Sequence, residues 1–146
     1  LEYSSKGELV PDELTVELWR KYVETSASKG EFHPDHDSLI LDGIPRNAHQ
    51  VEMMNESIEV CAVLHLACND MSKMEERIQR RALKENRLDD GNVDIIRQRF
   101  ETYRQETQPV LDCYEKSIIH DIDSTNSPAE VLHDVLSVVV KLESSD

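Results

Sequence analysis

Three short runs rich in aliphatic residues constrain the fold of this chain most. They lie at residues 39–41 (LIL), 60–66 (VCAVLHL) and 118–123 (IIHDID), with helical patterns between and after them. A continuous apolar run is typical of a strand that is covered on both faces, as in a parallel sheet. Strands that alternate with helices therefore predict an α/β fold, in three α/β/α layers around a parallel sheet.

The segments between these runs carry helix signals. Apolar spacing predicts helices over about residues 13–28, with Leu14, Leu18 and Tyr22 on one face, over 47–57, and from Asp70 onward. A longer helix is expected over about 93–116, with a kink at Pro109. The last helix follows a capping box that begins at Ser127.

Length and charge restrict the classes of function. At 146 residues the chain has room for one domain with a single core. Its formal net charge of −14 argues against binding to nucleic acid or to anionic membranes, and no apolar run is long enough to span a bilayer. The three cysteines lack CxxC spacing, so no zinc site is expected. A cytoplasmic protein is predicted.

Two charged stretches are candidates for chemistry. Asp42, Gly43, Pro45 and Arg46 directly follow the first apolar run, and open α/β sheets bind ligands beyond the carboxyl ends of their strands. Residues 77–104 contain eight basic and five acidic side chains, and seven of the bases are arginine. Arginine suits two-point contact with phosphate oxygens, although a solvated helix with alternating charges explains the same stretch.

Several motifs in this order resemble those of the adenylate kinase family of nucleoside monophosphate kinases. They are GELVPDELTVEL at 7–18, LILDGIPRNAHQ at 39–50, the RxxxR pair Arg77 and Arg81, NRLDDGNVDIIRQRFETY at 86–103 and IDSTNSPAEVLHDVL at 122–136. The resemblance covers nearly the whole chain. It implies a P-loop nucleoside monophosphate kinase fold of the short-lid type, with the lid at residues 81–90, that transfers a phosphoryl group from ATP to AMP and gives two ADP.

The resemblance also implies roles on the AMP side. Asp42 holds Mg²⁺ through water, which suits a cation that keeps much of its hydration shell. Arg46 grips the α-phosphate of AMP, and Gln50 reads adenine with an amide that both donates and accepts. Residues 1–10 form the end of the monophosphate-binding segment. The AMP pocket is completed by Glu8, Leu9, Val10, Gly43, Ile44 and Pro45.

On the ATP side, the resemblance assigns Arg77, Arg81 and Asn126 to binding. Arg87 and Arg99 close over the transferring phosphoryl group and, with Arg46, form the catalytic set. Because that group spreads negative charge over its oxygens, positioned cations and Mg²⁺ supply the catalysis and no side-chain nucleophile is needed. The expected partners are ATP, AMP and ADP, and the protein is expected to be a monomer.

The sequence departs from the family pattern at three places. Ile44 replaces a phenylalanine, and Asn47 stands where adenylate kinases commonly have threonine and uridylate/cytidylate kinases often have asparagine. No GxxxxGK phosphate loop occurs, so the resemblance implies a further strand–loop–helix unit of roughly 30 residues upstream. The 146 residues alone are therefore expected to be inactive. A pyrimidine nucleotide kinase and a non-catalytic nucleotide-binding or regulatory remnant remain alternatives.

Overall fold

The computed structural model describes residues 10–68, 70–85 and 93–144, and these form two compact units. One unit holds residues 10–59 and Arg97–Cys113. The other holds residues 60–68, 70–85, 93–96 and 114–144. The boundary between the units falls within helix α4 (Val93–Thr102). The expectation of a single core stays a prediction.

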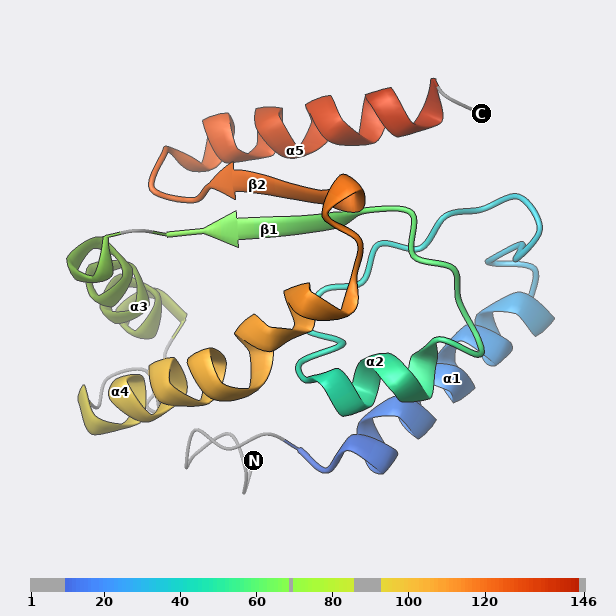
Figure 1. Cartoon of the computed structure of the whole chain (residues 1–146), viewed down its shortest axis with the longest axis horizontal. Helices are drawn as coiled ribbons and strands as arrows, with labels where there is room; N and C mark the ends of the chain where they lie inside the picture. The colour runs from blue at the N-terminus through green and yellow to red at the C-terminus, as the bar shows by residue number, and fades with distance from the viewer. Residues whose placement is uncertain (1–9, 69, 86–92, 145–146) are drawn as a thin grey trace. The chain divides into compact units, whose positions relative to one another are not determined.

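The first unit is built around the packing of α1 (Asp12–Ser28) on α2 (Ala48–Met54), which lie side by side in Figure 1. Asp12, Val16 and Arg20 recur every four residues and so share one face of α1. Val16 is completely buried, and the Arg20 Nη2 donates to the carbonyl of Met53 at 2.5 Å. This face therefore contacts α2, whereas the predicted face of Leu14, Leu18 and Tyr22 is exposed.

The expected strand at residues 39–41 is not formed. This segment has no regular structure, and Leu39 and Ile40 are 41% and 80% exposed. A strand needs a neighbouring backbone to pair with, and no described segment pairs with this one. The turn that follows contains Gly43 at φ +83° and a cis peptide bond between Ile44 and Pro45.

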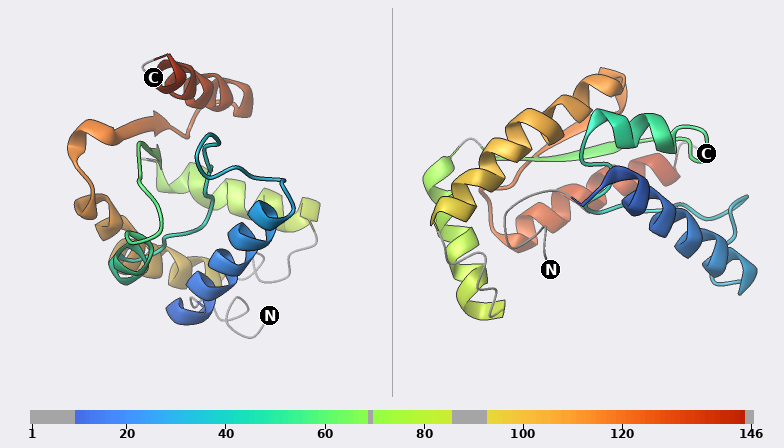
Figure 2. Two further views of the ribbon diagram at one scale, coloured as in Figure 1. Left: turned by 90° about the vertical axis from the view of Figure 1, so that its right-hand side faces the viewer. Right: turned by 90° about the horizontal axis from the view of Figure 1, so that it is seen from below.

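The second unit holds a two-stranded sheet of β1 (Val63–Ala67) and β2 (Ile119–Asp123). The strands are parallel, with Val63 opposite Ile119 and Ala67 opposite Asp123, which confirms the predicted parallel pairing. Helix α3 (Met71–Glu85) follows β1, and α5 (Pro128–Glu143) runs along β2 in Figure 1. Figure 2 shows the same elements from two further sides. The three-layer arrangement is not seen among the described residues.

The long helix expected over residues 93–116 is interrupted. Regular α-helix ends at Thr102, a π-helical turn spans Tyr103–Thr107 and a 3₁₀-helix spans Gln108–Cys113. The Gln108 N–H bonds to the Tyr103 carbonyl, five residues back. Pro109 explains the change, because it has no N–H to continue the ladder and its ring crowds the preceding turn. A short 3₁₀ turn, Lys116–Ile118, leads into β2.

Helix α5 begins with the predicted capping box, which is confirmed. The Ser127 N–H and hydroxyl donate to Glu130 Oε2 at 2.9 and 2.6 Å, and the Ser127 hydroxyl accepts from the Glu130 N–H at 3.4 Å. These hydrogen bonds hold the pKa of Glu130 below its ordinary value. Within the described ranges, no helix has both the length and the apolar character that crossing a bilayer requires.

We expect Ser127→Ala to lower the melting temperature, because the Glu130 N–H loses its partner and the Glu130 carboxylate loses the hydroxyl that donates to it. Since the pKa of Glu130 is lowered in the folded state, its contribution is present above the ordinary pKa of 4.5 and is lost as the pH falls further. The difference in melting temperature between wild type and variant should thus shrink between pH 6 and the acid range. Ser137→Ala, within the same helix, is the control and should change little; an equal loss there would contradict the assignment.

Candidate functional site

The turn at residues 42–46 holds the side chain of Arg46 in a fixed place. The Arg46 Nε donates to the Gly43 carbonyl at 2.7 Å. A Cβ added to Gly43 would lie 3.1 Å from Arg46 Nη2, and the positive φ of Gly43 disfavours any other residue. The turn therefore favours glycine at residue 43, and any side chain there would make the Arg46 guanidinium shift by a few tenths of an ångström. Asp42 and Arg46 are both exposed, so their charges are accessible to a ligand.

Gln50 lies in the first turn of α2 and is only 1% exposed. Its Oε1 accepts a hydrogen bond from the Arg46 N–H at 2.7 Å, and its Nε2 donates to Asp12 Oδ1 at 2.7 Å. Both ends of the buried amide therefore have a partner in the protein. The side chain joins the turn at residues 42–46 to the start of α1.

Asn47 completes this cluster as the N-cap of α2. Its Oδ1 accepts from the Gln50 N–H at 2.8 Å, and its Nδ2 donates to both carboxylate oxygens of Asp12 at 3.0 Å. Asn47 is 9% exposed. Asp12 could not be predicted as part of this site, because an acid in the first turn of a helix is explained by the helix terminus alone. Its VPDE context gave no indication of a partner 38 residues away.

The described residues expected to bind AMP all lie in the first unit. Val10 precedes α1 and is 42% exposed, and Arg99 lies half-buried on α4. Ile44 and Pro45 are half-buried in the turn. Glu8, Leu9 and Arg87 lie outside the described residues. The described residues expected to bind AMP are Val10, Gly43, Ile44, Pro45, Arg46, Gln50 and Arg99. Asp42, expected to hold Mg²⁺ through water, lies in the same unit.

In the second unit, Arg77 is joined to the loop between β2 and α5. Its Nη2 donates to the Asn126 carbonyl at 2.6 Å, and its Nη1 donates to the Ser124 carbonyl. The N–H and hydroxyl of Ser124 both donate to the Ala67 carbonyl, at 2.9 and 2.8 Å. The loop is therefore held by α3 and by the end of β1. Arg81 is exposed on α3, one turn beyond Arg77.

The same loop carries a stabilised negative charge at Asp123. Its Oδ1 accepts from the Thr125 hydroxyl at 2.6 Å and from the Thr125 N–H at 2.8 Å. These bonds, with smaller contributions from Lys73 and Arg77, hold the pKa of Asp123 below its ordinary value. The carboxylate therefore stays ionised and keeps the turn in shape.

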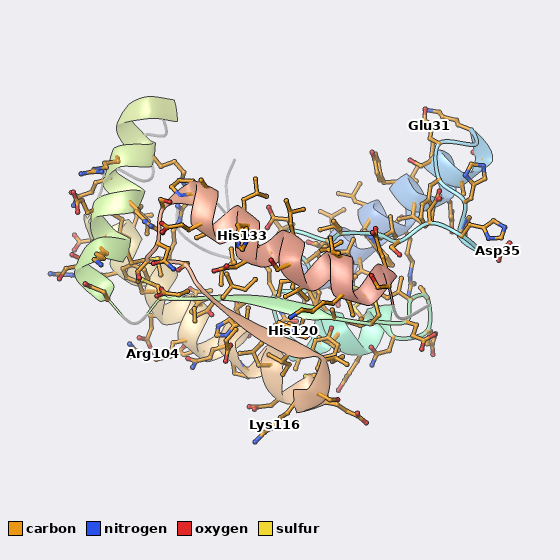
Figure 3. The ribbon with its side chains drawn as sticks, turned by 90° about the horizontal axis from the view of Figure 1, so that it is seen from above. Glu31, Asp35, Arg104, Lys116, His120 and His133 are labelled. Atoms are coloured by element: carbon orange, nitrogen blue, oxygen red, sulfur yellow. The ribbon has the colours of Figure 1, made fainter. Side chains whose placement is uncertain are left out.

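A cleft of about 430 Å³ opens beside this loop, at the first turns of α5. It is lined by Asn126, Ala129, Glu130, His133 and Asp134, and Figure 3 labels His133 on α5. Two of these five residues are acidic, so the cleft disfavours phosphate and suits an uncharged group. Among the residues expected to bind ATP, Asn126 lines this cleft, and its carbonyl accepts a hydrogen bond from Arg77.

Comparison with known proteins identifies the family. A family model described as adenylate kinase matches residues 2–119. The chain belongs to the adenylate kinase family. An adenylate kinase of Porphyromonas gingivalis is 30% identical over 145 residues, covering 95% of this chain and 70% of the relative. An adenylate kinase of Bifidobacterium longum is 38% identical over 122 residues, which cover 79% of this chain and 60% of the relative. A UMP-CMP kinase of Bos taurus is 28% identical over 145 residues, which cover 96% of this chain and 71% of the relative.

We expect Arg77→Ala to loosen the loop between β2 and α5, because two backbone carbonyls lose a charged donor. Amide hydrogen exchange of a peptide that covers residues 119–134 should become faster in the 146-residue chain. Arg80→Ala is the matched control, since Arg80 lies on the same helix and its Nη2 donates to Glu76 Oε1, one turn away on that helix, at 2.5 Å. Equal exchange in the two variants would contradict a loop held by Arg77.

Proposed function

We propose that this adenylate kinase family member transfers the γ-phosphoryl group of ATP to AMP, with Mg²⁺, and gives two ADP. One observation carries the proposal beyond the family match. Arg46, the expected phosphate ligand, and Gln50, the expected base ligand, lie in one short segment. The backbone N–H of Arg46 donates to Gln50 Oε1 at 2.7 Å. A guanidinium for phosphate and an amide for a base are the groups that recognise a nucleoside monophosphate.

Asp42 fits the role of the magnesium residue. It is an exposed carboxylate at the start of the turn. The described ranges contain no group of three or more acidic, histidine or cysteine side chains placed to enclose a metal. Mg²⁺ takes one or two carboxylates and completes its shell with water and substrate phosphates. When bound, the ion would neutralise charge on the donor phosphates.

The arginines would divide the phosphates of the two substrates between them. Arg46, already held by the Gly43 carbonyl, binds the α-phosphate of AMP with its remaining N–H groups. Arg99 and Arg87 stabilise the group in transfer. Arg77 and Arg81 serve the ATP phosphates, and the cleft at Asn126 takes the uncharged adenine of ATP, because its acidic lining repels phosphate.

A UMP/CMP-type kinase is the second candidate, favoured by the Bos taurus relative and by Asn47. Both ends of the Asn47 amide have partners, since its Oδ1 caps α2 and its Nδ2 bonds Asp12. The same holds for the Gln50 amide, so these contacts favour neither residue as the base ligand. The choice of adenine rests on the family resemblance at Gln50, and a comparison of acceptors tests it.

A coupled ADP assay tests the proposal with AMP, CMP and UMP as acceptors. The assay compares the 146 residues with a chain that adds the phosphate-loop segment expected upstream. We expect the extended chain to transfer phosphate to AMP faster than to CMP or UMP, with Mg²⁺ required, and the 146 residues alone to give no turnover. Faster transfer to UMP or CMP would establish the pyrimidine type. No transfer by either chain would establish the non-catalytic alternative.

In the active chain, Arg99→Ala should lower kcat at least about a hundredfold with little change in AMP affinity, as expected for a contact made mainly in the transition state. Arg104→Ala is the control, because Arg104 is an exposed arginine one turn further along the same segment (Figure 3). Steady-state kinetics and AMP titration give the two parameters. Turnover of Arg99→Ala equal to that of Arg104→Ala would exclude the catalytic role.

A further inference from the structure

The Asp12 carboxylate is the centre of a hydrogen-bond cluster that joins α1 to the start of α2. Its Oδ1 accepts from Gln50 Nε2 at 2.7 Å, and both of its oxygens accept from Asn47 Nδ2 at 3.0 Å. Gln50 is 1% exposed and Asn47 9%, so the two donors meet the carboxylate away from bulk water. Hydrogen bonds to an ionised acceptor are about twice as strong as those between neutral groups. Asp12 therefore holds the first residues of α2 against α1.

This cluster reaches Arg46 through the backbone. Gln50 Oε1, at the other end of the amide that Asp12 binds, accepts from the Arg46 N–H at 2.7 Å. The next residue, Asn47, is fixed at the N-cap of α2, because its Oδ1 accepts from the Gln50 N–H at 2.8 Å. The backbone on both sides of the Arg46 Cα is thus tied to side chains that Asp12 binds.

The side chain of Arg46 is fixed at both of its ends. Its Cα is held by the backbone contacts of the cluster, and its Nε donates to the Gly43 carbonyl at 2.7 Å. The guanidinium reaches this carbonyl because the Cα keeps its place relative to Gly43. Arg46 is nevertheless exposed and accessible to an anion. An arginine held in this way loses less conformational entropy on binding an anion than one that rotates freely.

We propose that Asp12 is a positioning residue for the binding of a phosphate monoester by Arg46. The proposal rests on the part of the proposed function in which Arg46 binds the phosphate of AMP, and it is independent of which residue reads the base. Asp12 does not contact the nucleotide, and its own negative charge opposes the binding of an anion. A loss of positioning therefore weakens AMP binding, whereas a loss of the charge alone strengthens it.

A double-mutant cycle on the 146-residue chain tests this route. Calorimetry gives the dissociation constant of AMP for wild type, Asp12→Asn, Arg46→Ala and the double variant. Asp12→Asn keeps the size of the side chain, but one of its oxygens becomes an amide nitrogen that faces the donor of Asn47 or of Gln50. Because a buried donor then lacks its acceptor and the cluster loosens, we expect AMP binding to weaken roughly tenfold.

Arg46→Ala keeps the backbone N–H that Gln50 accepts, so it removes the guanidinium and leaves the cluster intact. It should weaken AMP binding by itself. In this background, Asp12→Asn should leave the remaining AMP affinity nearly unchanged, because the group that Asp12 positions is already absent. A role of Asp12 in general stability does not produce this dependence on the guanidinium.

Glu13→Gln is the matched control, because it removes the same charge from the same turn of α1 at an exposed residue. It should not weaken AMP binding. Thermal unfolding followed by the fluorescence of Trp19, the one tryptophan in the sequence, checks that each variant is folded. If Asp12→Asn does not fold, Asp12→Glu takes its place in the cycle, since the longer side chain displaces the carboxylate and retains its charge. Any loss of AMP affinity should again depend on Arg46.

The outcomes separate the inference from the proposed function. An equal loss of AMP affinity from the Asp12 variant with and without the Arg46 guanidinium overturns the positioning role and leaves the proposed function standing. Unchanged or tighter AMP binding by the Asp12 variant, or a loss equal to that of Glu13→Gln, does the same. If Arg46→Ala binds AMP as tightly as wild type, or if the wild-type chain binds no AMP, the phosphate role proposed for Arg46 is overturned, and the inference with it.

Discussion

The hydrogen bonds that link Asp12, Gln50 and Arg46 connect the two helices and the turn of the first unit. Buried polar groups are costly unless every donor and acceptor is paired, and here the partners come from α1, α2 and the turn at residues 42–46. The apolar contact beneath them is small, with Val16, Val51 and Met54 as its buried centre. The polar cluster therefore specifies which faces of the helices meet, while these apolar side chains supply the burial.

How much the sequence can predict depends on where each segment finds its partners. The capping box at Ser127 and the parallel strands β1 and β2 could be predicted, because a local pattern or a pair of apolar runs contains both partners. The run at residues 39–41 has the same apolar character, yet it forms no strand because no described segment pairs with it. Pro109 marked a kink in the sequence, but the widening to a π-helical turn before it depends on the backbone path.

The candidate site shows the same limit. The family resemblance assigned roles to Arg46, Gln50 and Arg77, since each lies in a recognisable short pattern. The orientation of their side chains could not be predicted, because it depends on contacts across 38 residues for Gln50 and 49 for Arg77. Asp12 was missed for the same reason. The first turn of a helix is by itself a sufficient reason for an acidic residue, and the hydrogen-bond partners of Asp12 are known only from the fold.

Arg46 and Arg77 are held by backbone carbonyls in a comparable way. Arg46 donates to Gly43, and Arg77 donates to Ser124 and Asn126. A guanidinium has five N–H donors, so these bonds orient the group and leave other donors for a phosphate. Binding of an ion by an arginine that is already oriented loses less conformational entropy than binding by one that is free. A backbone carbonyl also brings no net charge, so the arginine keeps its full attraction for an anion, which a carboxylate partner would reduce.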